Sequence, residues 1–233
     1  MTIRDVADLG TILSIWAHPD DESYLSGGIM TAAVAAGSRV VCVTATKGEA
    51  GGPGAPAETA IVRDAELMAC LAELGIDEHH WLGYPDGGCA DVDPEEAIAQ
   101  ISALLTAVAP DAVLTFGPDG YTDHPDHRAV SGWVTVAVAR AGHLPRLHYV
   151  TGTPEWFVEF GPAFAALGLP DSLPPVWPAD QLSIEIALDE RALDRKIAGL
   201  GAQPSQITAT RALWGDDLFR RVQSVERYRS AAS

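Results

Sequence analysis

Basic residues are scarce in this sequence, and lysine is nearly absent. Only 15 lysines and arginines stand against 32 aspartates and glutamates, which leaves a formal net charge of −17. Lys47 and Lys196 are the only lysines. A surface of this sign repels phosphate backbones and anionic lipids, so the composition argues against partners of both kinds, nucleic acid and membrane. Its simplest consequence is solubility.

Cysteines are few, and long apolar runs are missing. The three cysteines, Cys42, Cys70 and Cys89, form no CxxC pair. They predict neither a disulfide framework nor a cysteine zinc site, and reduced thiols are typical of a cytoplasmic protein. No run approaches the roughly 20 apolar residues that span a bilayer. Residues 1–10 carry aspartates and lack the apolar core of a signal peptide. We therefore expect a cytoplasmic location.

Short apolar runs alternate with segments of helical periodicity along most of the chain. The apolar runs predict strands at 12–17, 39–46, 80–83, 112–116, 147–151 and 183–188. The periodic segments predict helices at 26–36, 59–74, 94–108, 125–141, 190–200 and 212–229. Short links between them predict a Rossmann-like, mostly parallel sheet with helices on both faces. A length of 233 residues suits a single α/β domain over 1–233.

The pattern breaks between residues 152 and 180, where prolines and aromatic residues crowd together. The segment is too aromatic to be a disordered linker. We predict an irregular excursion that covers the site and influences the choice of substrate.

Polar clusters follow the predicted strands directly, at 18–22, 47–49, 85–87 and 119–127. Doubly wound sheets bind their ligands beyond the carboxyl ends of the strands. The placement of these clusters therefore predicts one shared site at that edge of the sheet.

The first cluster contains His18, Asp20 and Asp21. Adjacent carboxylates raise each other's pKa unless a cation relieves them. Imidazole and carboxylate together suit Zn²⁺ or Fe²⁺. The alternative is a helix N-terminus, with Asp20 or Asp21 as the cap and Glu22 in the first turn.

The second cluster contains His124, Asp126 and His127 at the start of a predicted helix. The two histidines are three positions apart and therefore share a helix face. Asp126 is placed to orient one imidazole. A histidine pair alone is more often structural. Two histidines and one carboxylate from distant segments, however, make a three-ligand site with an open position, which is the catalytic pattern.

Five motifs in strand order resemble the LmbE/PIG-L family of zinc-dependent N-acetylglucosaminyl deacetylases. They are AHPDDE at 17–22, Thr46-x-Gly48-Glu49, Arg63-x-x-Glu66, LGYPDG at 82–87 and HPDH at 124–127. The resemblance spans about residues 12 to 150. This sequence differs from the family's later H-x-S-Q pattern, because Gln203 occupies the position of the histidine.

The resemblance implies a role for each matching residue. It assigns the metal, Zn²⁺ with Fe²⁺ as the alternative, to His18, Asp21 and His127. It makes Asp20 the general base and His124 the stabiliser of the oxyanion, oriented by Asp126. It assigns the sugar pocket to Glu49, Arg63 and Asp86. It makes Tyr121 a fourth substrate-binding residue, a tyrosine that approaches the reacting carbonyl, although the spacing from Tyr121 to His124 is one residue longer than the pattern. The alternatives to these pocket roles are structural. Arg63 would form an ion pair with Glu58 or Glu66 on a helix surface, and Asp86 would belong to an ordinary turn.

The resemblance implies a hydrolase that removes an N-acetyl group from a small N-acetylated sugar or glycoside. The same site would also suit an amidase of a sugar–thiol conjugate. A non-haem iron oxygenase is a rival of another class, because His18-Pro19-Asp20 with a distant histidine is a facial-triad pattern. A nucleotide-binding module is disfavoured, because the first strand lacks GxGxxG. The sequence leaves a homo-oligomer open.

Overall fold

The computed structural model describes residues 2–52, 54–167 and 176–231. Within them the chain forms a seven-stranded sheet of order β3-β2-β1-β4-β5-β7-β6. The strands are β1 (Ile12–Trp16), β2 (Val40–Thr44), β3 (Glu78–Trp81), β4 (Ala112–Thr115), β5 (Arg146–Val150), β6 (Leu182–Ala187) and β7 (Val225–Ser230). Strands β1 to β5 are parallel, whereas β7 runs antiparallel to both β5 and β6. The predicted mostly parallel sheet is therefore confirmed.

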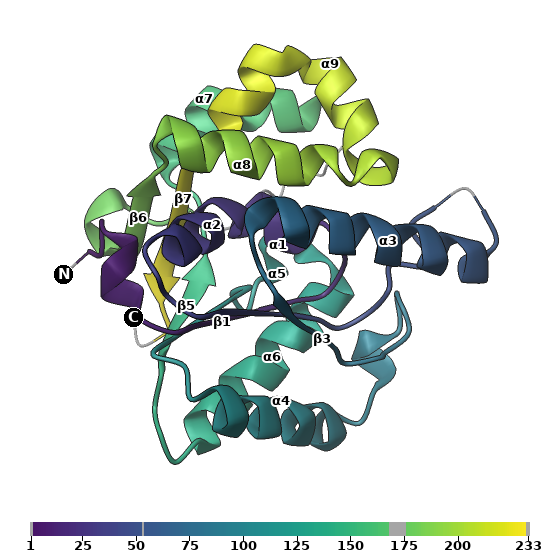
Figure 1. Ribbon diagram of the computed structural model, residues 1–233, viewed down its shortest axis with the longest axis vertical. Coiled ribbons are helices and arrows are strands. Elements are labelled where there is room, and N and C mark those ends of the chain that lie inside the picture. The colour runs from purple at the N-terminus through teal and green to yellow at the C-terminus, as the bar shows by residue number, and fades with distance from the viewer. Residues whose placement is uncertain (1, 53, 168–175, 232–233) are drawn as a thin grey trace.

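Helices lie on both faces of the sheet, as predicted (Figure 1). On one face are α4 (Pro94–Val108) and α6 (Pro125–Arg140), which pack together. The other face carries α2 (Gly27–Ala35), α3 (Pro56–Leu74) and α8 (Glu190–Gly201). The remaining helices are α1 (Asp21–Leu25), α5 (Gly120–Asp123), α7 (Pro154–Ala165) and α9 (Pro204–Val222), with 3-10 turns η1 (Val6–Leu9), η2 (Cys89–Asp91) and η3 (Ala179–Gln181). None of the helices in the described ranges has the length and apolarity that a bilayer crossing requires.

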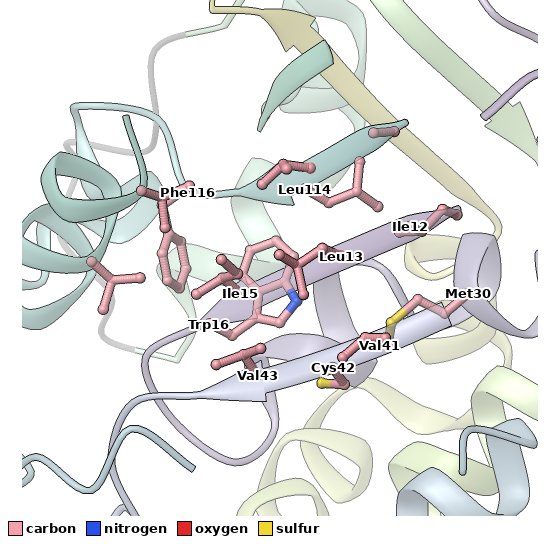
Figure 2. Close-up of a cluster of buried hydrophobic side chains, with 14 of the residues drawn as sticks. Ile12, Leu13, Ile15, Trp16, Met30, Val41, Cys42, Val43, Leu114 and Phe116 are labelled. Carbon is pink, nitrogen blue, oxygen red and sulfur yellow. The ribbon is translucent and has the colours of Figure 1, made fainter. Parts of the chain in front are cut away.

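The centre of the sheet is buried on both faces, which explains its continuous apolar runs. Every residue of β1, β2 and β4 is buried. Figure 2 shows Ile15 and Trp16 of β1 beside Val43 of β2 and Phe116, which follows β4. The Trp16 and Phe116 rings meet edge to face with centroids 4.9 Å apart. This core fixes the ends of β1 and β4, from which the site loops leave.

One segment predicted as irregular is in part a helix. Helix α7 occupies Pro154–Ala165, inside the proline- and aromatic-rich stretch at 152–180. Thr153 caps this helix, because its hydroxyl accepts a hydrogen bond from Trp156 N at 3.2 Å. Pro154 then occupies the first helical turn, where a missing N–H costs little. The prediction of an irregular segment was wrong here, because a proline in the first turn is compatible with a helix. Residues 168–175 of the stretch lie outside the described residues.

The C-terminal prediction was also wrong in part. Residues 225–230 form strand β7, although a helix was expected over 212–229. Gly215 interrupts the helical geometry of α9 with φ 73° and ψ 160°, a conformation open essentially to glycine alone. Strand β7 is inserted between β5 and β6, so its hydrogen bonds come from distant segments. Local periodicity cannot reveal such pairing.

Candidate active site

The two histidine-containing clusters meet at the carboxyl edge of the sheet. Strands β1 and β4 are parallel neighbours, so the loops that follow them emerge side by side. His18 follows β1, and His127 lies in the first turns of α6, which follows β4. Their side chains touch although 109 positions separate them, with His18 Nδ1 3.2 Å from His127 Nε2.

Asp21 completes a set of three donors with these histidines. Its Oδ2 lies 3.6 Å from His18 Nδ1, and its Oδ1 lies 3.5 Å from His127 Nε2. Zinc bonds to nitrogen and oxygen of about 2.0–2.2 Å place neighbouring tetrahedral donors roughly 3.3–3.6 Å apart. The donor set therefore fits a small divalent cation in both chemistry and spacing. A nitrogen of His124 also lies within 4.8 Å of the His18 and His127 nitrogens.

The ring nitrogens that point away from this centre are held by the protein. His18 Nε2 lies 3.0 Å from Asp86 Oδ1 and 3.2 Å from Asp126 Oδ2. His127 Nδ1 lies 2.9 Å from the carbonyl oxygen of Gly120, and its ring stacks on Phe116 at 4.0 Å. Metal-binding histidines usually carry such a contact on the second nitrogen, because it fixes the tautomer and the ring orientation.

The charge balance also favours a cation at this centre. Burial opposes protonation of His18, yet its contacts with Asp126, Asp21 and Asp86 raise its pKa to about 12. Burial likewise opposes ionisation of Asp21, but the neighbouring His127 and His18 lower its pKa to about 2. Several buried carboxylates therefore surround this centre and favour positive charge there.

Asp20 sits beside the donors in a strained backbone conformation. It occupies the cap position of α1 with φ 117°, which is unusual for any residue other than glycine. Among the described residues its side chain caps no amide, so the helix-cap alternative is not realised for Asp20. Its Oδ2 lies 3.6 Å from Arg63 Nη2. Burial and the Asp21 charge raise the pKa of Asp20 to about 8, although Arg63 opposes the rise.

Glu22 and Gln203 hold this strained backbone. Glu22 is fully buried, and its Oε2 accepts a hydrogen bond from Asp20 N at 2.9 Å. Its Oε1 accepts from Gln203 Nε2 at 2.7 Å. Gln203 is the residue that replaces the histidine of the H-x-S-Q pattern, so here an amide supports Glu22. No local pattern predicts this contact, because 181 positions separate the two residues.

Gln203→Ala should remove the strong donor of Glu22 Oε1 and leave this buried oxygen with only the weak thiol donor of Cys70, at 3.6 Å. We expect unfolding to become easier by about 1–3 kcal/mol. We also expect kcat to fall more than KM changes, because Asp20 loses its indirect support. Chemical denaturation and steady-state kinetics measure the two effects. Gln203→His restores a ring donor and should recover most of both; equal stability and turnover for Gln203→Ala and the wild type would contradict this role.

His124 is oriented by a backbone amide. It caps α6, and its Nδ1 accepts a hydrogen bond from Asp126 N at 3.2 Å. The ring proton of neutral His124 therefore sits on Nε2, which becomes a donor. The Asp126 carboxylate was expected to make this contact, but it accepts instead from Gly87 N at 2.7 Å and Cys89 N at 3.1 Å. Asp126 is fully buried in the first turn of α6, which aims its side chain at residues 87–89.

The three predicted sugar-pocket residues tie the site loops together. Arg63 is 4% exposed and donates to the carbonyl oxygens of Gly48, at 2.9 Å, and Pro19. Glu49 Oε1 accepts from Asp86 N at 2.9 Å, and Asp86 Oδ2 accepts from Ala50 N at 2.8 Å. A Cβ on Gly48 would lie 2.2 Å from Arg63 Nη1, so the close approach requires glycine.

A cavity of about 460 Å³ opens in front of the donors. Asp20, Asp21, His127 and Tyr121 line it, so the tyrosine predicted to approach the reacting carbonyl lies at its wall. Of the described residues that line it, none is Glu49, Arg63 or Asp86. A contribution of those three residues to substrate binding stays a prediction. Cavities of this size accommodate small organic ligands.

Comparison with known proteins relates the whole arrangement to one family. The family model described as "PIG-L: GlcNAc-PI de-N-acetylase" matches residues 13–138. The 1D-myo-inositol 2-acetamido-2-deoxy-alpha-D-glucopyranoside deacetylase of Mycobacterium sp. (strain JLS) is 32% identical over 232 residues, covering 84% of this chain and 74% of that protein.

Two solved structures show the same fold at low identity. N,N'-diacetylchitobiose deacetylase from Pyrococcus horikoshii has a TM-score of 0.63 and 20% identity, covering 96% of this chain and 84% of that one. The 4-carboxy-2-hydroxymuconate hydratase from Pseudomonas putida KT2440 has a TM-score of 0.66 and 18% identity, covering 96% of both chains. The fold alone therefore does not specify the reaction. The family match covers more than half of the chain, including both histidine clusters, and the chain belongs to the PIG-L family of GlcNAc-PI de-N-acetylases.

Proposed function

We propose that this protein is a zinc-dependent hydrolase that removes an N-acyl group from an amino-sugar glycoside. The observation that carries the proposal is the convergence of His18, Asp21 and His127 at tetrahedral spacing, with Asp20 beside them at the cavity wall. Three protein donors with an open side are typical of catalytic zinc sites. Membership of a de-N-acetylase family supports the reaction type.

The chain's own residues supply the proton transfers. When bound, the cation would supply positive charge for the developing oxyanion and would lower the pKa of water to about 7. Asp20 accepts the proton of the attacking water and returns it to the leaving amine. His124 donates from Nε2 to the oxyanion, with its ring fixed by the Asp126 amide. The amide C–N bond breaks, water is consumed, and a carboxylic acid and a free amine leave.

The rival functions receive less support. An iron oxygenase would need Asp20 in its facial triad, whereas Asp21 is the carboxylate that lies within 3.6 Å of both His18 and His127. The matched relatives are named as deacetylases, so the conjugate amidase is also not favoured. Iron remains an alternative metal, because the same donor types bind Fe²⁺.

The direct test is hydrolysis by metal-free protein that has been reloaded with Zn²⁺. The substrates are N-acetylglucosaminyl inositol, on which the mycobacterial relative is named to act, and simple N-acetylglucosamine glycosides. We expect equal amounts of acetate and free amine, only in the presence of metal and equally without oxygen. Protein that carries one metal ion per chain and releases no amine from any of these compounds would refute the proposed reaction.

His124→Ala should keep zinc and lose turnover. Removing one oxyanion donor typically lowers kcat by about 100- to 1,000-fold. His124→Gln retains a side-chain donor and should lose less. Zinc content by emission spectroscopy separates this role from a ligand role, because His124 lies close enough to the other histidines to bind metal. Loss of zinc in His124→Ala would assign it to the ligands instead.

A further inference from the structure

The cavity continues away from the donors to a wall of aromatic side chains. Trp156 and Phe164 of α7, Trp214 of α9 and Tyr24 of α1 line this part. We call these four residues the aromatic wall. It faces the same cavity as Asp20, so a molecule whose amide lies at Asp20 extends toward it.

Mutual ring contacts hold the aromatic wall together. The Trp156 and Phe164 centroids are 5.2 Å apart, and those of Phe164 and Trp214 are 4.9 Å apart. Phe219 continues the contacts, lying 6.3 Å from Trp214 and 6.5 Å from Tyr24. Trp214 Nε1 donates to the carbonyl oxygen of Ala163 at 3.0 Å, so its only polar atom is already used. The indole therefore offers carbon surface to the cavity.

Two charged residues that line the cavity, Lys196 and Glu226, are already paired with each other. Lys196 Nζ lies 2.7 Å from Glu226 Oε1 and donates to the carbonyl oxygen of Tyr24 at 2.9 Å. The Glu226 carboxylate also accepts from Gly28 N and Ile29 N, at 2.8 and 2.7 Å. Lys196 and Glu226 are 1% and 4% exposed. Breaking such a buried pair is costly, so these groups are poor partners for sugar hydroxyls.

We propose, on the basis of the function proposed above, that the natural substrate carries an apolar substituent that packs against the aromatic wall. A sugar or inositol ring alone can cover this carbon surface only with its C–H groups, so part of the wall would stay against water at a loss of the hydrophobic contribution. The substituent is either an acyl chain longer than acetyl or an apolar aglycone. Either substituent would bury carbon against the aromatic wall. The acyl chain is attached through the amide carbonyl, whereas the aglycone is attached to the sugar that bears the amide nitrogen.

Two substrate series distinguish these sources. One varies the acyl group of methyl glucosaminide from acetyl to hexanoyl, and the other varies the aglycone of N-acetylglucosamine from methyl to hexyl. Each fully buried methylene typically improves binding by about fourfold, so kcat/KM should rise at least about tenfold along one series. A rise of kcat/KM in the first series identifies the apolar substituent as an acyl chain. A rise in the second series identifies it as an aglycone. Flat values in both series would overturn the proposal.

A matched pair of variants tests whether the aromatic wall causes the rise. Trp214→Ala should bring the ratio of longest to shortest substrate close to one. Leu213→Ala changes the adjacent residue, which is 54% exposed and is not among the described residues that line the cavity, and should keep the wild-type ratio. An unchanged ratio in Trp214→Ala would overturn the assignment to this wall.

Binding of amines that cannot be hydrolysed separates this proposal from the proposed reaction. Calorimetry compares hexyl glucosaminide and N-hexylglucosamine with their methyl counterparts. At least about tenfold tighter binding of one hexyl compound supports the aromatic wall as a ligand site even if no amide is cleaved. Equal affinities would refute the wall's role even if acetyl groups are removed.

Discussion

Asp20→Asn is expected to retain its metal and to lose turnover by about 100- to 10,000-fold, the usual contribution of a positioned acid or base. Asparagine keeps the size of the side chain but cannot accept the proton of the attacking water. The Asp20 backbone is held through Glu22 and is not altered by this change. The donors His18, Asp21 and His127 are also untouched, so zinc should still bind.

The measurement is kcat together with metal content on the same preparation. Asp64→Asn is a suitable control, because Asp64 of α3 pairs with Lys47 and its side chain is 38% exposed. That variant should match the wild type in both readouts. Wild-type turnover in Asp20→Asn would remove Asp20 from the chemistry, and lost zinc would make it part of the metal site.

The second large effect is expected from His127→Ala, which removes one of three donors. Changes to residues that merely support metal ligands weaken binding about 10- to 100-fold. Loss of a ligand should weaken zinc binding by more than this range. Turnover should fall in proportion to the zinc occupancy of the site. Titration with Zn²⁺ under competition from a chelator measures the affinity.

His143→Ala provides the matched histidine control. His143 Nε2 contacts the carbonyl oxygen of Pro110, in the loop before β4 and at the other end of that strand from His127. Its replacement should leave zinc affinity and turnover unchanged. Unaltered zinc binding in His127→Ala would show that the imidazole contact with His18 is not part of a metal site.

The supporting residues show where sequence reasoning reached its limit. The motifs drew attention to Glu49, Arg63 and Asp86 as residues of a sugar pocket. In the fold, Arg63 binds main-chain oxygens of two loops, and Asp86 lies 3.0 Å from His18 Nε2. A motif shows which residues belong to a site. It does not show which side of the metal donors they occupy, because this depends on how the loops pack.

The sequence by itself determined the parallel part of the sheet, β1 to β5, and the meeting of the two histidine clusters. Apolar runs and helical periods are local, and the carboxyl ends of adjacent parallel strands must share one edge. Only the tertiary structure decided the support of Glu22 by Gln203, the direction of the Asp126 carboxylate and the insertion of β7 between β5 and β6. It also decided that α7 and α9 build an aromatic wall in front of Asp20. These features depend on contacts between distant segments, and packing across such distances leaves no periodic trace in the chain.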